Sequence, residues 1–307
     1  MNTASLPPAG QAGRGPDHGI RGSPFLDPES LMRKIRELAK PRPIYTPQNA
    51  YAVHALRYDW TGWLSGDAAF PATTSRAIAE AAPLWKGDGL EMETFRAMRH
   101  KVQILFKTAP RVSPVFFNAR VKGRLQHALR QAGTPVKFSR KVAFRSLGEN
   151  IRDVVENYLR KQVRKEGFID PRHVKRMHEF TVVRDRIDLS EPTTSLSGRY
   201  WYNLHVVMVV SGRRHIVAYS LLGRIRDGAL RIADKKNYPL KSVSVMHDHV
   251  HMALRGDIAQ SPEEMALCFM NNLAYMMGYN REWEARYYVG TFSEYGMDVI
   301  RRDSERG

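Results

Sequence analysis

Hydrophobic positions in the first half of the chain alternate between the two-residue period of strands and the longer period of helices. One helix is well marked, because Ser113 is a typical N-cap residue followed by proline, and the pattern ends before Gly133. The pattern predicts strands over 51–60, 90–98, 102–108 and 141–145, and helices over 73–84, 113–132 and 149–165.

The second half of the chain repeats this order of elements. Gln103 precedes Ser113 by ten residues, and His251 precedes Ser261, a second Ser-Pro helix start, by the same interval. We therefore predict an α+β chain built from a degenerate internal repeat. The elements of the second copy are strands over 199–210, 241–245, 250–255 and 286–292, and helices over 216–236, 261–279 and 295–302.

The repeat and the composition between its copies predict the domain organisation. Residues 7–28 are rich in Gly and Pro, which indicates disorder, and residues 29–39 can form a short basic helix. Residues 166–197 are charged and end in Pro, Thr and Ser, as is typical of a linker with some local structure. We expect an N-terminal extension over 1–45, a first domain over 46–165, this linker, and a second domain over 198–307.

The chain carries 48 Lys and Arg against 31 Asp and Glu, a formal net charge of +17. A solvated surface does not need this excess, so a polyanionic partner is the leading interpretation, against a basic protein without a nucleic-acid role. The single cysteine, Cys268, excludes an intramolecular disulfide and fits the reducing cytoplasm. No stretch approaches the roughly 20 apolar residues of a membrane span, so we expect no membrane partner.

Two histidines stand two residues apart in a strand-like stretch. His249 and His251 would project from one face of a strand and can share a cation, because alternate residues of a strand point the same way. Imidazole is a good ligand for divalent metal ions. Solvent-facing histidines are the alternative, but the apolar neighbours Val250 and Met252 and the preceding Asp248 favour metal binding.

Tyr158 and Gln162 are one helical turn apart on the polar helix predicted over 149–165. A tyrosine beside Arg160 and Lys161 fits either packing or chemistry. A phenol with a free pKa of about 10 is a poor nucleophile, and it needs nearby positive charge and a polarised target. Gln162 can supply a carbonyl oxygen as a third metal ligand beside the two histidines.

The sequences around these candidates resemble one family. Met-His-Asp-His-Val-His-Met-Ala-Leu over 246–254, the Ser-Pro that follows it, and Tyr-Tyr-Val-Gly-Thr over 287–291 resemble the single-tyrosine HUH transposases, which include the REP-associated tyrosine transposases. Residues 144–162 resemble the strand and nucleophile helix of the same family. The resemblance implies two tandem ferredoxin-like or RRM-like domains with antiparallel sheets, each followed by a C-terminal helix.

The resemblance also implies an activity, which is cleavage and transfer of single-stranded DNA near a hairpin through a 5′-phosphotyrosine intermediate. By this resemblance His249 and His251 match the histidine pair, Tyr158 matches the nucleophile, and Gln162 matches the third ligand. Phosphate and water ligands beside two imidazoles favour Mg²⁺ or Mn²⁺.

Each half of the chain keeps a different part of this site. Lys101 and Gln103 occupy the histidine positions of the first half, and Asp303 falls at the tyrosine position of the second. Lys101 is either a stabiliser of phosphate charge or a solvated replacement. We therefore expect one composite site per chain, in an intramolecular pseudo-dimer that can act as a monomer.

Basic residues are concentrated in the first half. Residues 113–165 hold 13 Lys and Arg against 3 Asp and Glu, whereas residues 261–284 hold one Arg and four Glu. We place single-stranded or hairpin DNA on this basic surface, with RNA as a further option and a merely solvated helix as the alternative. A DNA-binding protein of this kind would be associated with the nucleoid. The expected contacts are Arg120, Lys122, Arg124, Arg130, Lys137, Arg140, Lys141, Arg145, Arg160 and Lys161.

Three functions remain open at this point. The first is an active DNA strand transferase, either a transposase or a domesticated relative. The second is a catalytically inactive binder of hairpin DNA or RNA that acts in regulation or in a larger complex. The third is a metal-dependent nuclease that uses water in place of Tyr158. Three aromatic residues, Tyr58, Trp60 and Trp63, suit either base stacking or core packing.

Overall fold

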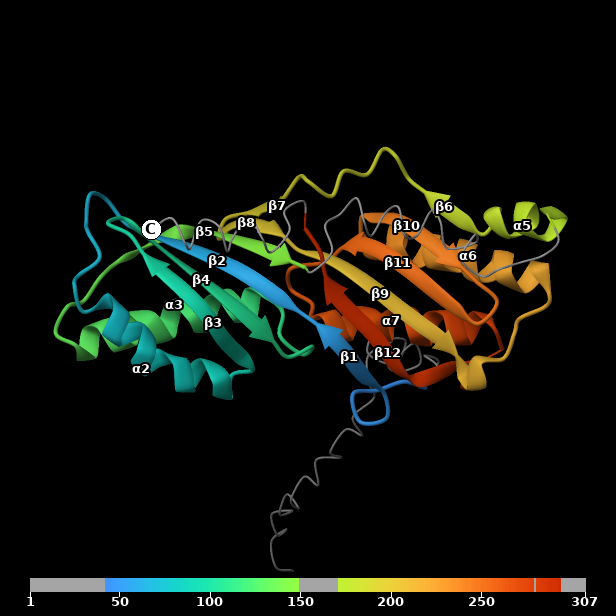
Figure 1. Cartoon of the computed structure of the whole chain (residues 1–307), viewed down its shortest axis with the longest axis horizontal. Helices are drawn as coiled ribbons and strands as arrows, with labels where there is room; N and C mark the ends of the chain where they lie inside the picture. Colours follow the sequence, from blue (N-terminus) through green and yellow to red (C-terminus); the bar gives the residue numbers. More distant parts are fainter. Residues whose placement is uncertain (1–41, 149–170, 279, 294–307) are drawn as a thin grey trace, which may run out of the picture. The chain divides into compact units, whose positions relative to one another are not determined.

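The computed structural model describes residues 42–148, 171–278 and 280–293. The described residues from Pro43 onward belong to one compact unit. They form two six-stranded sheets, each with two long helices packed on it (Figure 1). Tyr158, Gln162, Arg160 and Lys161 lie outside the described residues.

The first sheet has the strand order β3-β4-β2-β5-β8-β7. Its strands are β2 (Arg57–Leu64), β3 (Leu90–Ala97), β4 (Lys101–Thr108), β5 (Phe138–Leu147), β7 (Thr193–Ser195) and β8 (Gly198–Trp201). Helices α2 (Thr74–Gly87) and α3 (Pro114–Gln131) pack against each other and against this sheet.

The second sheet has the order β1-β12-β9-β11-β10-β6. Its strands are β1 (Tyr51–Ala55), β6 (Thr181–Val183), β9 (Asn203–Val210), β10 (Leu240–Val245), β11 (His249–Arg255) and β12 (Trp283–Thr291). Helices α6 (Tyr219–Lys236) and α7 (Pro262–Met276) pack on it, and the short α5 (Pro171–His178) and the 3-10 turn Ser211–Arg213 complete the elements described.

Both sheets contain the same four-stranded antiparallel core. The order β5-β2-β4-β3 in one corresponds to β12-β9-β11-β10 in the other. In each, the connections run strand, helix, strand, strand, helix, strand. This is the ferredoxin-like arrangement, and the predicted fold class of two antiparallel-rich α+β domains is confirmed. The helices predicted over 149–165 and 295–302 lie outside the described residues.

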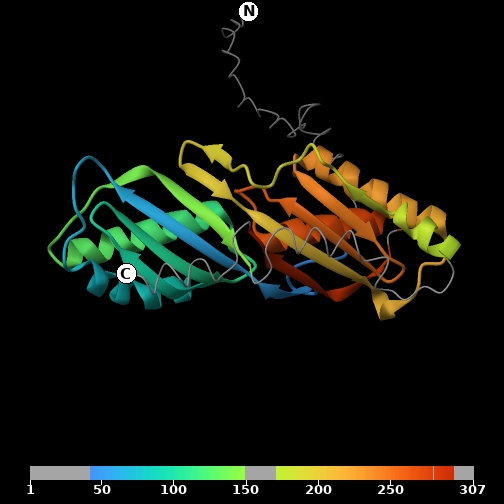
Figure 2. The ribbon, with the colours of Figure 1, turned by 45° about the horizontal axis from the view of Figure 1, so that its top comes forward.

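Two predicted strands turn out to cross from one sheet to the other. The stretch predicted over 51–60 is divided into β1, which pairs in parallel with β12, and β2, which lies in the first sheet. The stretch predicted over 199–210 is likewise divided into β8, which pairs in parallel with β5, and β9 in the second sheet (Figure 2). Buried Leu56 and Tyr202 stand at the two crossings, so the hydrophobic pattern runs through without a visible break.

The other predicted elements within the described residues differ only at their ends, and the helix predicted over 29–39 lies outside those residues. The short strand predicted over 141–145 is the ten-residue β5, and the helix predicted to begin at 216 begins at Tyr219. Both Ser-Pro starts are confirmed as N-caps. The Ser113 hydroxyl accepts from the Phe116 N–H over 3.3 Å. Ser261 forms a reciprocal capping box with Glu264, with contacts of 3.2 and 2.7 Å.

Aromatic side chains fill the core beside α3. Tyr58 stacks on Phe144 with ring centroids 4.6 Å apart, and Phe117 meets Phe106 edge to face at 5.1 Å. Trp60 is fully buried, and its indole N–H donates to Asn118 Oδ1 over 3.0 Å. Tyr58 and Trp60 are therefore core residues and not base-stacking residues.

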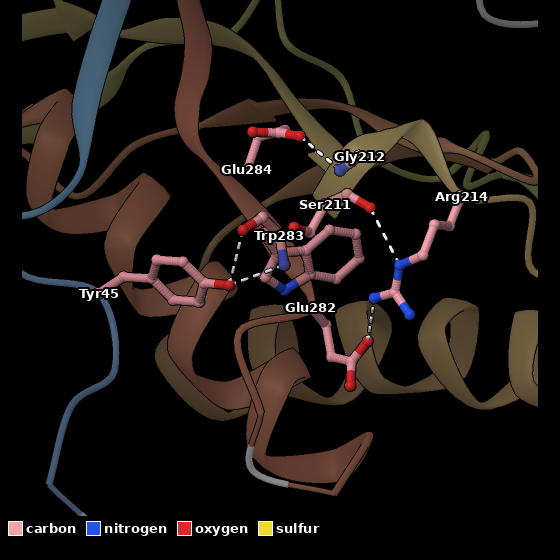
Figure 3. Close-up of polar contacts among 7 residues, drawn as sticks. All are labelled: Tyr45, Ser211, Gly212, Arg214, Glu282, Trp283 and Glu284. Atoms are coloured by element: carbon pink, nitrogen blue, oxygen red, sulfur yellow. Dashed lines mark hydrogen bonds and ion pairs between the residues drawn. The ribbon is translucent and has the colours of Figure 1, made fainter.

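The segment that precedes β1 is held by the second sheet (Figure 3). The Tyr45 hydroxyl accepts from the Trp283 N–H over 2.7 Å and donates to the Trp283 carbonyl over 2.9 Å. Burial raises the pKa of Tyr45 to about 12. Asn271 on α7 accepts from the N–H groups of Ile44 and Tyr45 over 2.7 and 2.9 Å. The chain therefore enters β1 from a fixed point on the second sheet.

Candidate active site

Strand β11 places the predicted histidine pair on one face of the second sheet. Val250, Met252 and Leu254 are buried at 1 % exposure or less and point into the core beneath the helices. His249 and His251 point to the opposite face by the two-residue period of the strand. Their ring centroids are 4.8 Å apart, with ring planes at 87°.

The residue before the pair orients the first imidazole. Asp248 Oδ1 lies 2.5 Å from His249 Nδ1, and Oδ2 accepts from Arg213 Nη1 over 3.0 Å. Burial opposes ionisation of Asp248, but the contacts with His249 and Arg213 outweigh it and lower the pKa of this carboxyl. An ionised carboxylate on Nδ1 fixes the tautomer of His249, and Nε2 is then its ligand nitrogen.

A third histidine, which the sequence reasoning missed, orients the second imidazole. His205 on β9 brings its Nε2 to 3.1 Å from His251 Nδ1. Burial lowers the pKa of His205 to about 4, so its ring is neutral near pH 7, and its Nε2 can accept a hydrogen bond from the Nδ1–H of His251. His205 has no neighbouring histidine along its own strand, so only strand pairing brings it to His251.

The donor set suits a divalent cation that takes further ligands from elsewhere. An imidazole that binds a metal ion usually has its other ring nitrogen engaged, as both Nδ1 atoms are here. In the part of the chain that the structure describes, no three His, Cys, Asp or Glu side chains are placed to hold a metal ion together. A third protein ligand has to come from another residue type or from outside the described ranges, where Gln162 lies.

The same positions of the first sheet carry different side chains. Register pairs Lys101 with Trp63 and Gln103 with Thr61, just as His249 pairs with Val209 and His251 with Val207. Asp59 then occupies the place of His205, and Gln103 Nε2 donates to Asp59 Oδ1 over 2.8 Å. An ammonium and an amide donor in place of imidazoles do not form a metal site.

A second histidine cluster adjoins the pair. His247 lies before β11, with its Nδ1 donating to the Ile216 carbonyl over 2.6 Å. Its Nε2 is 3.1 Å from Nε2 of His173 on α5, and His173 Nδ1 contacts the Tyr219 hydroxyl at 2.5 Å. With His215 these residues line a cavity of about 320 Å³.

The predicted nucleic-acid residues are divided between two faces of the first sheet. Phe144 packs on Phe117 of α3, so Arg145 next to it points to the opposite face. On the helical side, Asp88 pairs with Arg124 at 3.2 Å and Arg120 at 3.8 Å. The group on or beside α3 comprises Arg120, Lys122, Arg124 and Arg130, and the group on or beside β5 comprises Lys137, Arg140, Lys141 and Arg145.

One lysine of the helical group has an internal partner. Lys122 Nζ donates to the Ser139 carbonyl over 2.5 Å, and burial, with nearby Arg140, lowers the pKa of this amine. Arg130, Lys137, Arg140 and Lys141 are exposed. The α3 group and the β5 group therefore adjoin at Lys122 and Arg140.

Residues 199–302 match the family model described as "Transposase IS200 like". This match covers about a third of the chain and includes His205, His249 and His251. It supports the transposase resemblance seen in the sequence, and with it a DNA-binding, DNA-cleaving enzyme. Among curated proteins, none matches the chain. In the described parts of this chain, none of the helices has the length and apolar character needed to cross a membrane.

Proposed function

We propose that this protein cleaves and rejoins single-stranded DNA at hairpin-associated sites through a 5′-phosphotyrosine intermediate, with one composite site per chain. The observation that carries the proposal is the oriented pair of His249 and His251. It lies on the strand face opposite the helices, within the stretch that matches the IS200-like transposases.

The residues of the second sheet prepare a phosphate-binding site. Asp248 and His205 hold the two imidazoles by their Nδ1 atoms, so that each ring is fixed in orientation. A Mg²⁺ or Mn²⁺ ion bound by His249, His251 and Gln162 would supply electrostatic stabilisation of the charged phosphate. Arg213 screens the Asp248 carboxylate from the incoming DNA.

Tyr158 is the proposed nucleophile. Its phenolic oxygen attacks the scissile phosphorus and loses its proton, the bond to the 3′ oxygen breaks, and this oxygen leaves as a 3′-OH. Arg160 and Lys161, next to it in the sequence, would offset the charge that develops on the phosphate. Religation reverses the same step with a different 3′-OH.

The proposal that the two halves act as a pseudo-dimer draws support from the exchanged strands. β1 of the first half pairs with β12 of the second, and β8 of the second half pairs with β5 of the first. Such reciprocal exchange resembles strand swapping between two subunits of a symmetric dimer. The loss of histidines at Lys101 and Gln103 accords with a single surviving site.

The same replacement favours the second candidate, a catalytically inactive binder of hairpin DNA or RNA. In that case the first half would have lost its metal-binding residues and would contribute only basic residues to nucleic-acid binding. The two candidates differ in whether a covalent adduct forms.

Incubation of the full chain with a labelled single-stranded DNA hairpin and Mn²⁺, followed by denaturing electrophoresis, tests the proposal. We expect a covalent protein–DNA adduct that is abolished by Tyr158→Phe and by His249→Ala. Cleavage that survives Tyr158→Phe but not His249→Ala would indicate a nuclease that uses water. Binding without adduct or cleavage would indicate the inactive binder.

A further inference from the structure

A cavity of about 280 Å³ opens beside the junction of the two sheets. It lies on β5, at the β8–β9 crossing and along the segment before β7. The residues used here are Arg145, Ser146, Ser190, Trp201 and Asn203. None of them belongs to the histidine pair or to the contacts that orient it.

Two flat side chains are stacked at the mouth of this cavity. The Arg145 guanidinium lies over the Trp201 ring at 4.4 Å, and the two residues are direct partners in the β5–β8 pairing. The Trp201 indole N–H donates to the Ser190 carbonyl over 2.6 Å, which fixes the ring. Arg145 also lies 3.9 Å from Asp59, while its side chain remains 40 % exposed. Indole rings and guanidinium planes are the groups on which unpaired bases stack.

The wall of the cavity includes a polar group that lacks a hydrogen-bond partner. Asn203 is 3 % exposed, and its Nδ2 donates to the Leu189 carbonyl over 3.0 Å. This contact fixes the amide orientation, and among the described residues Oδ1 then has no donor. A buried acceptor without a donor is costly, so the chain tolerates this cost beside the cavity.

The cavity and the histidine pair share one face of the same strand. Asn203, His205 and Val207 alternate along β9, and register places Val207 opposite His251. Val207 lies four residue steps beyond Asn203, a distance of about 13 Å at the usual rise per residue. A few nucleotides of single-stranded DNA can therefore reach from the histidine pair to the cavity.

We infer that this cavity binds one unpaired nucleobase of the DNA strand, stacked on the Arg145–Trp201 pair, and so selects the sequence beside the cleaved phosphate. The inference rests on the proposed function for the identity of the DNA strand. The base supplies the flat surface, and Arg145 supplies positive charge for the adjoining phosphate.

Fluorescence anisotropy with a labelled single-stranded decamer, compared with an abasic decamer of equal charge, tests the inference. The measurements use the full chain carrying Tyr158→Phe, with EDTA present, so that binding is separated from chemistry. We expect Trp201→Ala to weaken binding of the base-bearing decamer about tenfold, the effect expected when one stacked base is lost. Binding of the abasic decamer should not change.

The corresponding strand pair of the second sheet offers a matched control. Arg286 lies over the Tyr51 ring at 5.5 Å on the β1–β12 pair, and neither residue lines this cavity. Tyr51→Ala should leave both Kd values within about twofold. Arg145→Lys keeps the charge and leaves Trp201 in place. If this variant also weakens binding of the base-bearing decamer alone, the effect of Trp201→Ala cannot be explained by misfolding of that variant.

The base pocket would be overturned if Trp201→Ala and Arg145→Lys weakened binding of the two decamers equally. It would also be overturned if neither variant changed the binding of the base-bearing decamer. A base-dependent loss in a protein that forms no DNA adduct would keep the pocket and reject the strand transferase. A DNA adduct formed by the protein, without any base-dependent loss of binding in the variants, would support the strand transferase and reject the pocket.

Discussion

The backbone N–H of Asn203 donates to the Ser146 hydroxyl over 3.0 Å, where the second-half strand leaves the first sheet. Its counterpart is the Arg57 N–H, which donates to the Thr291 hydroxyl over 3.0 Å where the first-half strand leaves the second sheet. Each hydroxyl belongs to the last core strand of one half, and each N–H to the first core strand of the other. The two halves are thus joined by two equivalent contacts at the crossings.

We expect Thr291→Val to destabilise the protein by about 2 kcal/mol. The Thr291 hydroxyl accepts from the Arg57 N–H and lies within hydrogen-bond distance of the carbonyls of Leu147 and Ala55, and valine can replace none of these contacts. Urea denaturation followed by circular dichroism measures the change. Thr194→Val on the exposed face of β7 is the control and should alter the free energy of unfolding by less than about 0.5 kcal/mol. Equal effects of the two substitutions would argue against a special role for the crossing.

Gly198→Ala should unpair β8 from β5. Gly198 has a φ of 146°, and a Cβ atom there would lie 2.1 Å from the Val142 carbonyl oxygen, so backbone would have to move. We expect a loss above about 2 kcal/mol in thermal or urea unfolding. Gly66→Ala is the matched control, since Gly66 also has positive φ, at 64°, but has nothing within 4 Å of the added Cβ. It should cost about 1 kcal/mol.

Asp248→Asn should weaken Mn²⁺ binding by about 10- to 100-fold. In the proposed metal site this carboxylate would orient His249 and raise its basicity as a ligand. Isothermal titration with Mn²⁺ measures the effect. Asp227→Asn removes an exposed carboxylate paired with Arg226 and should have no effect on the titration. A similar Mn²⁺ affinity in Asp248→Asn and the unsubstituted protein would contradict this role.

The buried Asp59 should make stability depend on pH. Burial raises the pKa of this carboxyl, although Gln103 and Arg145 partly oppose the shift. The folded state therefore binds the proton more tightly than the unfolded state. The resulting stability is present below the unfolded pKa of about 3.9 and is lost as pH rises through the folded pKa.

Comparison of Asp59→Asn with the unsubstituted protein by thermal unfolding between pH 3.5 and 8 measures this contribution. The variant should gain relative stability as pH rises, because its amide does not ionise and can still accept from Gln103. A relative stability that falls with rising pH would show that the pairing with Arg145 outweighs burial.

The sequence by itself determined the local elements and the repeat. Ser113 and Ser261 begin helices because their hydroxyls accept backbone N–H groups in the first turn, a property readable from a few adjacent residues. The shared face of His249 and His251 follows in the same way from the two-residue period of a strand. These are local consequences of residue type and spacing.

Only the tertiary structure decided which distant residues meet. The crossings at Leu56 and Tyr202 are invisible in the hydrophobic pattern, since a buried residue looks the same whether its strand stays in one sheet or enters another. His205 contacts His251, 46 positions further along the chain, because of the register between their strands. Arg145 lies over Trp201, 56 positions further along, for the same reason. Register depends on the packing of the whole sheet, and no short stretch of sequence carries it.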